Sequence, residues 1–181
     1  MNGIVIKTTG KYYTVKTDTS GIVQCRLKGK FRIAGIKSTN PIVVGDKVEL
    51  EEESKLWIII KLYERKNQII RKSVNLSKQT HIIAANIDQA FLIITLDSPT
   101  TSTGFIDRFL VTANAYSIDV ILLFNKIDLL KNNLKIEQEN LLKVYEKIGY
   151  TCLALSVIKD DLSIIKHLMK GKVNMISGHS G

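Results

Sequence analysis

The residues with the clearest chemistry in this 181-residue chain are Asn125, Lys126, Ile127 and Asp128. The Asp carboxylate can accept two hydrogen bonds from the N1 and N2 groups of guanine, which adenine does not offer. The Asn amide can brace the loop and reach the ring, and the apolar stem of the Lys can cover one face of the base. The pattern Asn-Lys-x-Asp therefore predicts a loop that selects guanine.

The position of this motif also fits a ligand site. The apolar run 120–124 comes directly before it and predicts a strand that is buried on both faces. Open α/β sheets bind their ligands at the carboxyl ends of such strands. A polar loop without a ligand is the alternative, and we prefer guanine binding because motif and placement agree.

A second loop supplies further candidates for the guanine site. Ser156 and Val157 follow the predicted strand 151–155. P-loop GTPases usually have Ser-Ala-Lys at this place, and a backbone N–H of that loop meets the guanine O6. Here the sequence reads Ser-Val-Ile, and the Lys is displaced to Lys159. We expect the backbone contact to survive, because it does not depend on the side chains.

Gly178, His179, Ser180 and Gly181 match the first four positions of a phosphate loop, Gly-x-x-x-x-Gly-Lys-Ser/Thr. Backbone N–H groups of such a loop wrap the phosphates of a nucleotide. A flexible Gly-rich terminus is the alternative, but the predicted strand 173–177 and the upstream motif favour a phosphate loop. In ordinary GTPases the phosphate loop precedes Asn-Lys-x-Asp, whereas here it follows.

We predict no catalytic residue and no metal ligand in this chain. His179 lies at a variable position of the phosphate loop, so packing within the loop is the better assignment for it. His81 and His167 have no partner at a spacing that suits metal binding or acid–base chemistry.

The elements that would position these loops alternate between strand and helix. Apolar runs predict buried strands at 90–95, 120–124, 151–155 and 173–177, and helical spacing predicts helices at 105–116, 137–148 and 162–169. The expected buried helical faces are Ile106, Phe109, Leu110 and Ala113, then Leu141, Val144, Tyr145 and Ile148, then Leu162, Ile165 and Met169. Gly149 would end the second helix, and Asp160 or Asp161 would cap the third. This alternation predicts a parallel sheet with right-handed crossovers.

The first part of the chain predicts a different architecture. Short runs rich in β-branched and aromatic residues indicate strands at 3–8, 12–17, 22–27, 48–52 and 56–63. Five strands within about 65 residues suit a small closed barrel, and the OB-fold is the leading candidate. The polar stretch 65–80 is interpreted as a connector. We therefore expect two domains, an OB-fold at 1–70 and an α/β domain at 71–181.

The whole excess of positive charge lies in the first 80 residues. Residues 1–80 hold 16 Lys and Arg against 7 Asp and Glu, whereas residues 81–181 hold 10 of each. This asymmetry favours a nucleic-acid partner over a merely solvated basic face. The candidate RNA-binding residues lie in the long third loop and its approaches, and they are Arg26, Lys28, Lys30, Phe31, Arg32 and Lys37. Tyr12 and Phe31 suit either base stacking or the barrel core.

The remaining composition indicates a folded cytoplasmic protein. Cys25 and Cys152 are the only cysteines, and two thiols so far apart argue for a reducing compartment and against a zinc site. No apolar run approaches the roughly 20 residues that span a bilayer, and the start of the chain has no signal-peptide layout. We expect no membrane association and a monomer.

Several segments together resemble the RsgA (YjeQ) family of circularly permuted GTPases. The matching segments are the basic OB-like unit, 71–76 (RKSVNL), 84–93 (AANIDQAFLI), 124–129 (FNKIDL) and 176–181 (ISGHSG). The resemblance covers essentially the whole chain, and the inverted order of the motifs makes it specific.

The resemblance implies a GTP-binding and GTP-hydrolysing factor for late maturation of the small ribosomal subunit, which would bind rRNA through the OB-fold. It implies GTP or GDP with Mg²⁺, and zinc in a further C-terminal domain. The rest of the phosphate loop, the switch regions and the zinc cluster do not follow Gly181. We therefore expect that this sequence is the first portion of a longer protein and does not hydrolyse GTP alone. The alternative is a non-catalytic RNA-binding module, an OB barrel with an α/β partner.

Overall fold

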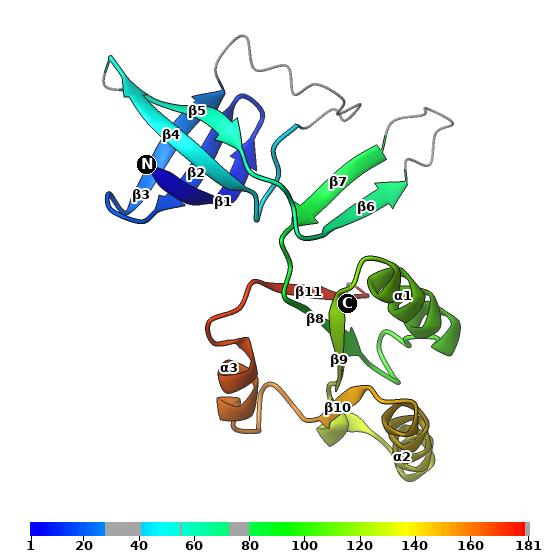
Figure 1. The fold of residues 1–181 in the computed structure, drawn as a ribbon. Helices are drawn as coiled ribbons and strands as arrows, with labels where there is room; N and C mark the ends of the chain where they lie inside the picture. Colours follow the sequence, from blue (N-terminus) through cyan, green and yellow to red (C-terminus); the bar gives the residue numbers. More distant parts are fainter. Residues whose placement is uncertain (28–40, 55, 73–79, 180–181) are drawn as a thin grey trace. The chain divides into compact units, whose positions relative to one another are not determined.

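The computed structural model describes residues 1–27, 41–54, 56–72 and 80–179, and these divide into two compact units at 1–86 and 87–181 (Figure 1). The first unit holds a β-barrel and a β-hairpin, and the second holds a parallel sheet with helices. The predicted fold class, an OB-like barrel followed by a parallel α/β domain, is confirmed.

The barrel is closed by five strands in the order β1-β2-β3-β5-β4. Their bounds are Asn2–Thr9, Tyr12–Thr17, Ile22–Leu27, Leu56–Leu62 and Lys47–Glu53, in that order. β3 pairs with β5 in parallel, and β1 pairs with β4 antiparallel to close the ring. All five strands lie within two residues of the predicted ones, because alternating burial imposes a period of two on the sequence.

Alternation along β2 separates the barrel core from its surface. Tyr13 and Val15 are buried in a cluster with Val5, Val48 and Ile59, whereas Tyr12 is 43% exposed. The core alternative for Tyr12 is therefore wrong, and its ring is free to take part in surface contacts. Phe31 lies outside the described residues.

The predicted connector 65–80 is wrong in part, because most of its described residues form a hairpin. β6 (Gln68–Lys72) pairs antiparallel with β7 (Thr80–Ala85), and the hairpin belongs to the same compact unit as the barrel. Backbone contacts of 44–45 with 84–85 join the two, including a bridge from Val44 to Ala84. The first compact unit therefore extends to residue 86, past residue 70. The domain boundary at residue 70 stays a prediction.

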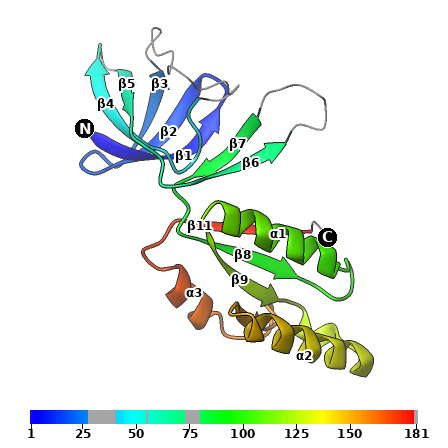
Figure 2. The same ribbon diagram turned by 45° about the vertical axis from the view of Figure 1, so that its right-hand side comes forward.

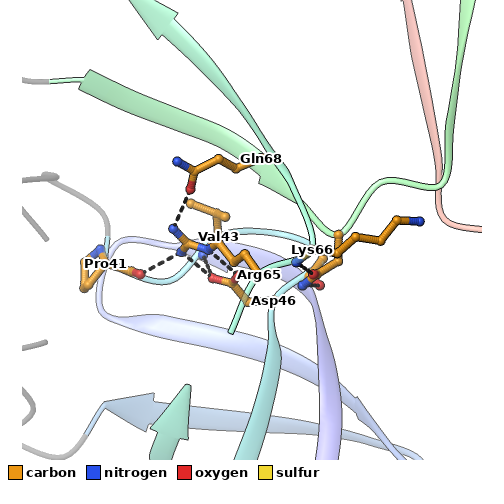
Figure 3. Close-up of polar contacts among 8 residues, drawn as sticks. Pro41, Val43, Asp46, Arg65, Lys66 and Gln68 are labelled. Carbon is orange, nitrogen blue, oxygen red and sulfur yellow. Dashed lines mark hydrogen bonds and ion pairs between the residues drawn. The ribbon is translucent and has the colours of Figure 1, made fainter. Parts of the chain in front are cut away.

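A buried ion pair fastens the segment before β6 to the barrel (Figure 3). Arg65 donates from Nε and one terminal nitrogen to the two carboxylate oxygens of Asp46 at 2.7 and 2.8 Å, and Asp46 is fully buried. The guanidinium also donates to the Pro41 carbonyl and the Gln68 side chain, each at 3.0 Å. The Val43 N–H supplies the carboxylate with a further hydrogen bond. All of these donors and acceptors are thus satisfied away from water.

The second unit is a four-stranded parallel sheet in the order β10-β9-β8-β11 (Figure 1). Its strands are β8 (Gln89–Ile94), β9 (Asp119–Phe124), β10 (Thr151–Ala154) and β11 (Asn174–Gly178). The central strands β8 and β9 are buried along nearly their whole length, as their continuous apolar runs predict. The chain moves outward from β8 to β10 and then returns to place β11 on the other side of β8.

Three helices cover this sheet, and their faces differ in part from the prediction. α1 (Thr103–Ala115) and α2 (Asn132–Lys147) lie on one side, and α3 (Ser163–Met169) lies on the other (Figures 1 and 2). Ile106, Leu110 and Ala113 of α1 are buried as expected.

Two details of α2 and α3 were predicted wrongly. Val144 and Ile148 are 55% and 63% exposed, so Tyr145 alone of the predicted α2 face is fully buried. Neither Asp160 nor Asp161 is the cap residue of α3, because Leu162 takes that position. Asp161 instead accepts a hydrogen bond from the Ser163 N–H, and Asp160 belongs to the candidate site described below. Gly149 has φ of 99° directly after α2, as expected for a helix stop.

Both cysteines are free thiols, with Cys25 buried and Cys152 half-buried. Burial raises the pKa of each thiol to about 11. Both are therefore protonated and unreactive at neutral pH. Within the described part of the chain, no helix is long and apolar enough to cross a membrane.

Gly45 is the position where the barrel and the hairpin approach most closely. It has φ of 91°, and a Cβ built on it would lie 1.9 Å from the Ala85 carbonyl oxygen. Gly10 is a matched control, because it also has positive φ but no atom within 4 Å of its Cβ position.

We expect Gly45→Ala to destabilise the first unit by about 3 kcal/mol or more, against about 1 kcal/mol for Gly10→Ala. The left-handed backbone strains both variants, and only the first also collides with backbone. Urea unfolding followed by fluorescence of Trp57, the single Trp of the sequence, measures both values. Equal losses would contradict the close approach.

Candidate guanine-nucleotide site

The predicted site loops all leave the same edge of the sheet. The parallel register pairs Ile94 with Phe124, Phe124 with Ala154, and Ile93 with Gly178. The strands therefore end together, and the segments 125–128, 156–157 and 178–179 begin at neighbouring positions. Carboxyl ends at a point where the strand order reverses are the usual ligand site of an open α/β sheet.

Asn125 braces the first loop against the second. Its backbone N–H donates to the Ile94 carbonyl at 2.8 Å, which continues the pairing of β9 with β8. Its side-chain oxygen accepts from the Val157 N–H at 3.1 Å. The Asn125 side chain therefore joins the two loops. The same contact occupies the Val157 N–H, one of the backbone groups of the loop that was expected to meet guanine O6.

Lys126 turns the chain after the strand. It has φ of 64° and ψ of 33°, a left-handed conformation that lets a short 3-10 turn, Ile127–Leu129, begin at once. Its ammonium donates to the Ser98 carbonyl at 2.7 Å, so its stem crosses from the β9 loop to the loop after β8. A stem held in this way can form one wall of a base pocket.

Asp128 carries the acceptor oxygens of the candidate site. Its side chain is 18% exposed, and Lys159 approaches its Oδ2 at 3.0 Å. The hydrogen bond from Lys159, followed by one from the Ser156 side chain, holds the pKa of the Asp128 carboxyl below its usual range. An ionised carboxylate can only accept hydrogen bonds, which suits the donor edge of guanine.

Ser156 and Val157 belong to a tight turn that is closed by Asp160. The Ser156 N–H donates to an Asp160 carboxylate oxygen at 2.7 Å, and the Asp160 N–H returns a bond to the Ser156 carbonyl at 2.9 Å. Ser156 is 2% exposed, whereas Val157 is 42% exposed. The turn is thus rigid at Ser156 and open at Val157.

Gly178 and His179 begin the candidate phosphate loop at the end of β11. A Cβ on Gly178 would lie 3.0 Å from the Ile93 carbonyl oxygen, so a glycine allows the close packing of β11 on β8. The His179 ring lies 4.2 Å from the Phe105 ring, centroid to centroid, next to the start of α1. This packing agrees with the assignment of His179 as a structural residue. Ser180 and Gly181 lie outside the described residues.

The candidate RNA-binding residues are only partly described. The Arg26 guanidinium lies 4.7 Å from the centroid of the Tyr12 ring on the barrel surface and also donates to the Tyr12 hydroxyl. Lys28, Lys30, Phe31, Arg32 and Lys37 lie outside the described residues. Among those that are described, no three His, Cys, Asp or Glu side chains gather where they could hold a metal ion.

Two residues that contribute to the candidate site, Ser98 and Asp160, were not predicted from the sequence. Ser98 contributes a backbone carbonyl, which any residue could supply, so no sequence signal marks it. Asp160 was read as a helix cap, although its place four residues after Ser156 also suits a side chain that folds back on its own turn.

Fold and site together define a circularly permuted GTPase domain that follows an OB-like barrel. The family model for the RsgA GTPase matches residues 62–181, and the model for the RsgA N-terminal domain matches residues 2–56. The chain therefore belongs to the RsgA family.

Two curated relatives are both named small ribosomal subunit biogenesis GTPase RsgA. The protein from Flavobacterium johnsoniae is 56% identical over the whole chain, and that from Bacteroides fragilis is 47% identical. The chain spans 57% and 59% of their respective lengths.

Two solved structures share the fold. YjeQ from Thermotoga maritima has a TM-score of 0.80 at 31% identity, and YloQ, described as a circularly permuted GTPase, has a TM-score of 0.78 at 29% identity. Each comparison covers 99% of this chain and 60% of the other.

The contacts of Asp128 predict how the site responds to acid. Because its pKa in the folded protein is lowered, the ionised carboxylate stabilises the fold above its unfolded pKa, and this stabilisation is lost as the pH falls through the lowered value. We expect Lys159→Met to move the titration midpoint of Asp128 upward, toward an ordinary Asp. NMR of the side-chain carboxyl carbon measures the midpoint.

Lys166→Met is the control for this titration, since Lys166 acts on the Asp161 carboxyl instead. It should leave the Asp128 midpoint in place. A midpoint that does not move in Lys159→Met would contradict the ion pair.

Proposed function

We propose that this chain is the rRNA-binding and guanine-selecting part of a GTPase that acts in maturation of the small ribosomal subunit. The observation that carries the proposal is the carboxylate of Asp128, which lies in the loop after β9 at the carboxyl edge of the sheet and pairs with Lys159 at 3.0 Å. Family membership and the names of the relatives support the reaction and the partner.

The proposed guanine site consists of Asn125, Lys126, Ile127, Asp128, Ser156 and Val157. Asp128 would accept from guanine N1–H and N2–H, and Lys126 would cover one face of the base. The backbone beginning at Gly178 and His179, with Ser180 and Gly181, would cradle the first phosphates.

The described residues contribute recognition and no phosphoryl-transfer group. Mg²⁺ supplies charge neutralisation at the phosphates when it is bound to a GTPase. We place no ligand for it or for zinc among the described residues, and both stay predictions for the full gene product. We propose the cytoplasm as the site of action, since ribosome assembly factors of bacteria act there. The monomeric state stays a prediction.

The specificity of the site can be tested with GDP and ADP. We expect the full gene product to prefer GDP, and Asp128→Asn to remove this preference, because the new amide group presents a donor to the donors of guanine. The loss of hydrogen bonds to a charged group corresponds to about 1.5–3 kcal/mol, tenfold or more in Kd. Calorimetry with both nucleotides measures it.

Asp119→Asn serves as the matched control, because Asp119 is exposed at the opposite end of β9. Equal binding of GDP and ADP by the unmutated protein would favour the alternative, a non-catalytic RNA-binding module.

The proposed RNA surface is the outer face of β1, β2 and β3. The exposed side chains of these strands include Lys7, Lys16 and Arg26, with no acidic residue among them, whereas β4 exposes Glu51, Glu52 and Glu53. The stacked Tyr12 and Arg26 add an aromatic face and a cation at one end. Cations contact phosphates and aromatic faces stack on unpaired bases, so this face suits single-stranded RNA.

We expect Arg26→Glu to weaken binding to small-subunit rRNA. It should also make the slope of log binding constant against log salt concentration less negative by about one. Lys61→Glu is the control, since it makes the same charge change on β5 beside the acidic strand. Binding measured between low and moderate salt gives both quantities. Equal losses in the two variants would assign the effect to net charge and contradict a specific face.

A further inference from the structure

The Asp128 carboxylate already faces a cation in the folded chain. The Lys159 ammonium lies 3.0 Å from its Oδ2. An ammonium supplies only donors, and an ionised carboxylate supplies only acceptors. Lys159 therefore draws on the same carboxylate that would read guanine.

Guanine would bring two donors, N1–H and N2–H, to the two oxygens of the same carboxylate. One of these donors would have to use Oδ2, the oxygen that the Lys159 ammonium approaches. The base and the ammonium would therefore compete for the negative charge of this carboxylate.

Lys159 can withdraw from the Asp128 carboxylate without moving backbone. Its side chain is 65% exposed and ends a flexible stem, so the ammonium can pass into water. Asp128 is not the partner of a buried pair, and an exposed ion pair of this kind costs little to break.

We propose that Lys159 is a specificity-tuning residue that competes with guanine for the Asp128 carboxylate and lowers the affinity for guanine nucleotides. The inference rests on the proposed guanine binding and deepens it. The Lys159 ammonium lies at the Asp128 carboxylate as a donor of the base would, so the nucleotide competes with it for this carboxylate. An adenine nucleotide has no N1–H or N2–H donors for the Asp128 carboxylate, so its affinity should not depend on Lys159.

The test compares three variants of the full gene product by competition of GDP or ADP against a fluorescent GDP analogue. Lys159→Met removes the charge and keeps the stem, Lys159→Arg keeps the charge, and Lys143→Met removes one exposed charge on α2. We expect Lys159→Met to lower the Kd for GDP about two- to fivefold. The other two variants should stay near the parent, and the Kd for ADP should not change.

Salt provides a second measurement that a merely structural role of Lys159 would not move. Because salt screens an exposed ion pair, the ratio of the GDP Kd values of the parent and Lys159→Met should approach one as ionic strength rises. A constant ratio would contradict competition.

The outcomes separate this inference from the proposed function. If Lys159→Met binds GDP equally or more weakly while Asp128→Asn still removes the GDP preference, competition is wrong and guanine selection stands. If the parent itself shows no preference for GDP over ADP, both are overturned.

Discussion

The shared register of four parallel strands is the constraint on which the candidate site depends. Backbone pairing aligns the ends of β8, β9, β10 and β11, so loops far apart in sequence must begin beside one another. Polar side chains of one loop can then hydrogen-bond to the next loop directly. The Asn125 side-chain oxygen, for example, accepts from the Val157 N–H at 3.1 Å. Pairing and burial of the apolar strands therefore bring the candidate site loops together.

The first unit depends on a different kind of interaction. The fully buried Asp46 carboxylate needs its two bonds from Arg65, because an unpaired buried charge would cost about 3–5 kcal/mol. The pair links the segment before β4 with the segment before β6, and the Asn86 side chain adds a bond to the Gly45 carbonyl at 2.9 Å. Barrel and hairpin are thereby one unit, although the hairpin adds no strand to the ring.

Most of the fold could be predicted because apolar periodicity reports burial directly. The runs at 120–124 and 12–17 carry that signal strongly, and both strands were placed correctly. The β6–β7 hairpin was missed because β6 holds a single apolar pair, Ile69 and Ile70, within a polar stretch. The burial of Val144 and Ile148 was predicted wrongly for the opposite reason. Their helical spacing is apolar, but none of the described residues buries them. The Lys159 contact depends on where a flexible side chain lies, which periodicity does not encode.

The order of the strands has a consequence for how the protein emerges during synthesis. β8, β9 and β10 and the loops after them lie within residues 89–160, so the candidate guanine-binding loops come from one contiguous stretch. β11, which pairs with β8 across about 85 residues of sequence, is made after them. Because chains fold from the N-terminus as they are made, the guanine loops can take shape before the phosphate loop exists. A GTPase with the usual motif order would build its phosphate loop first.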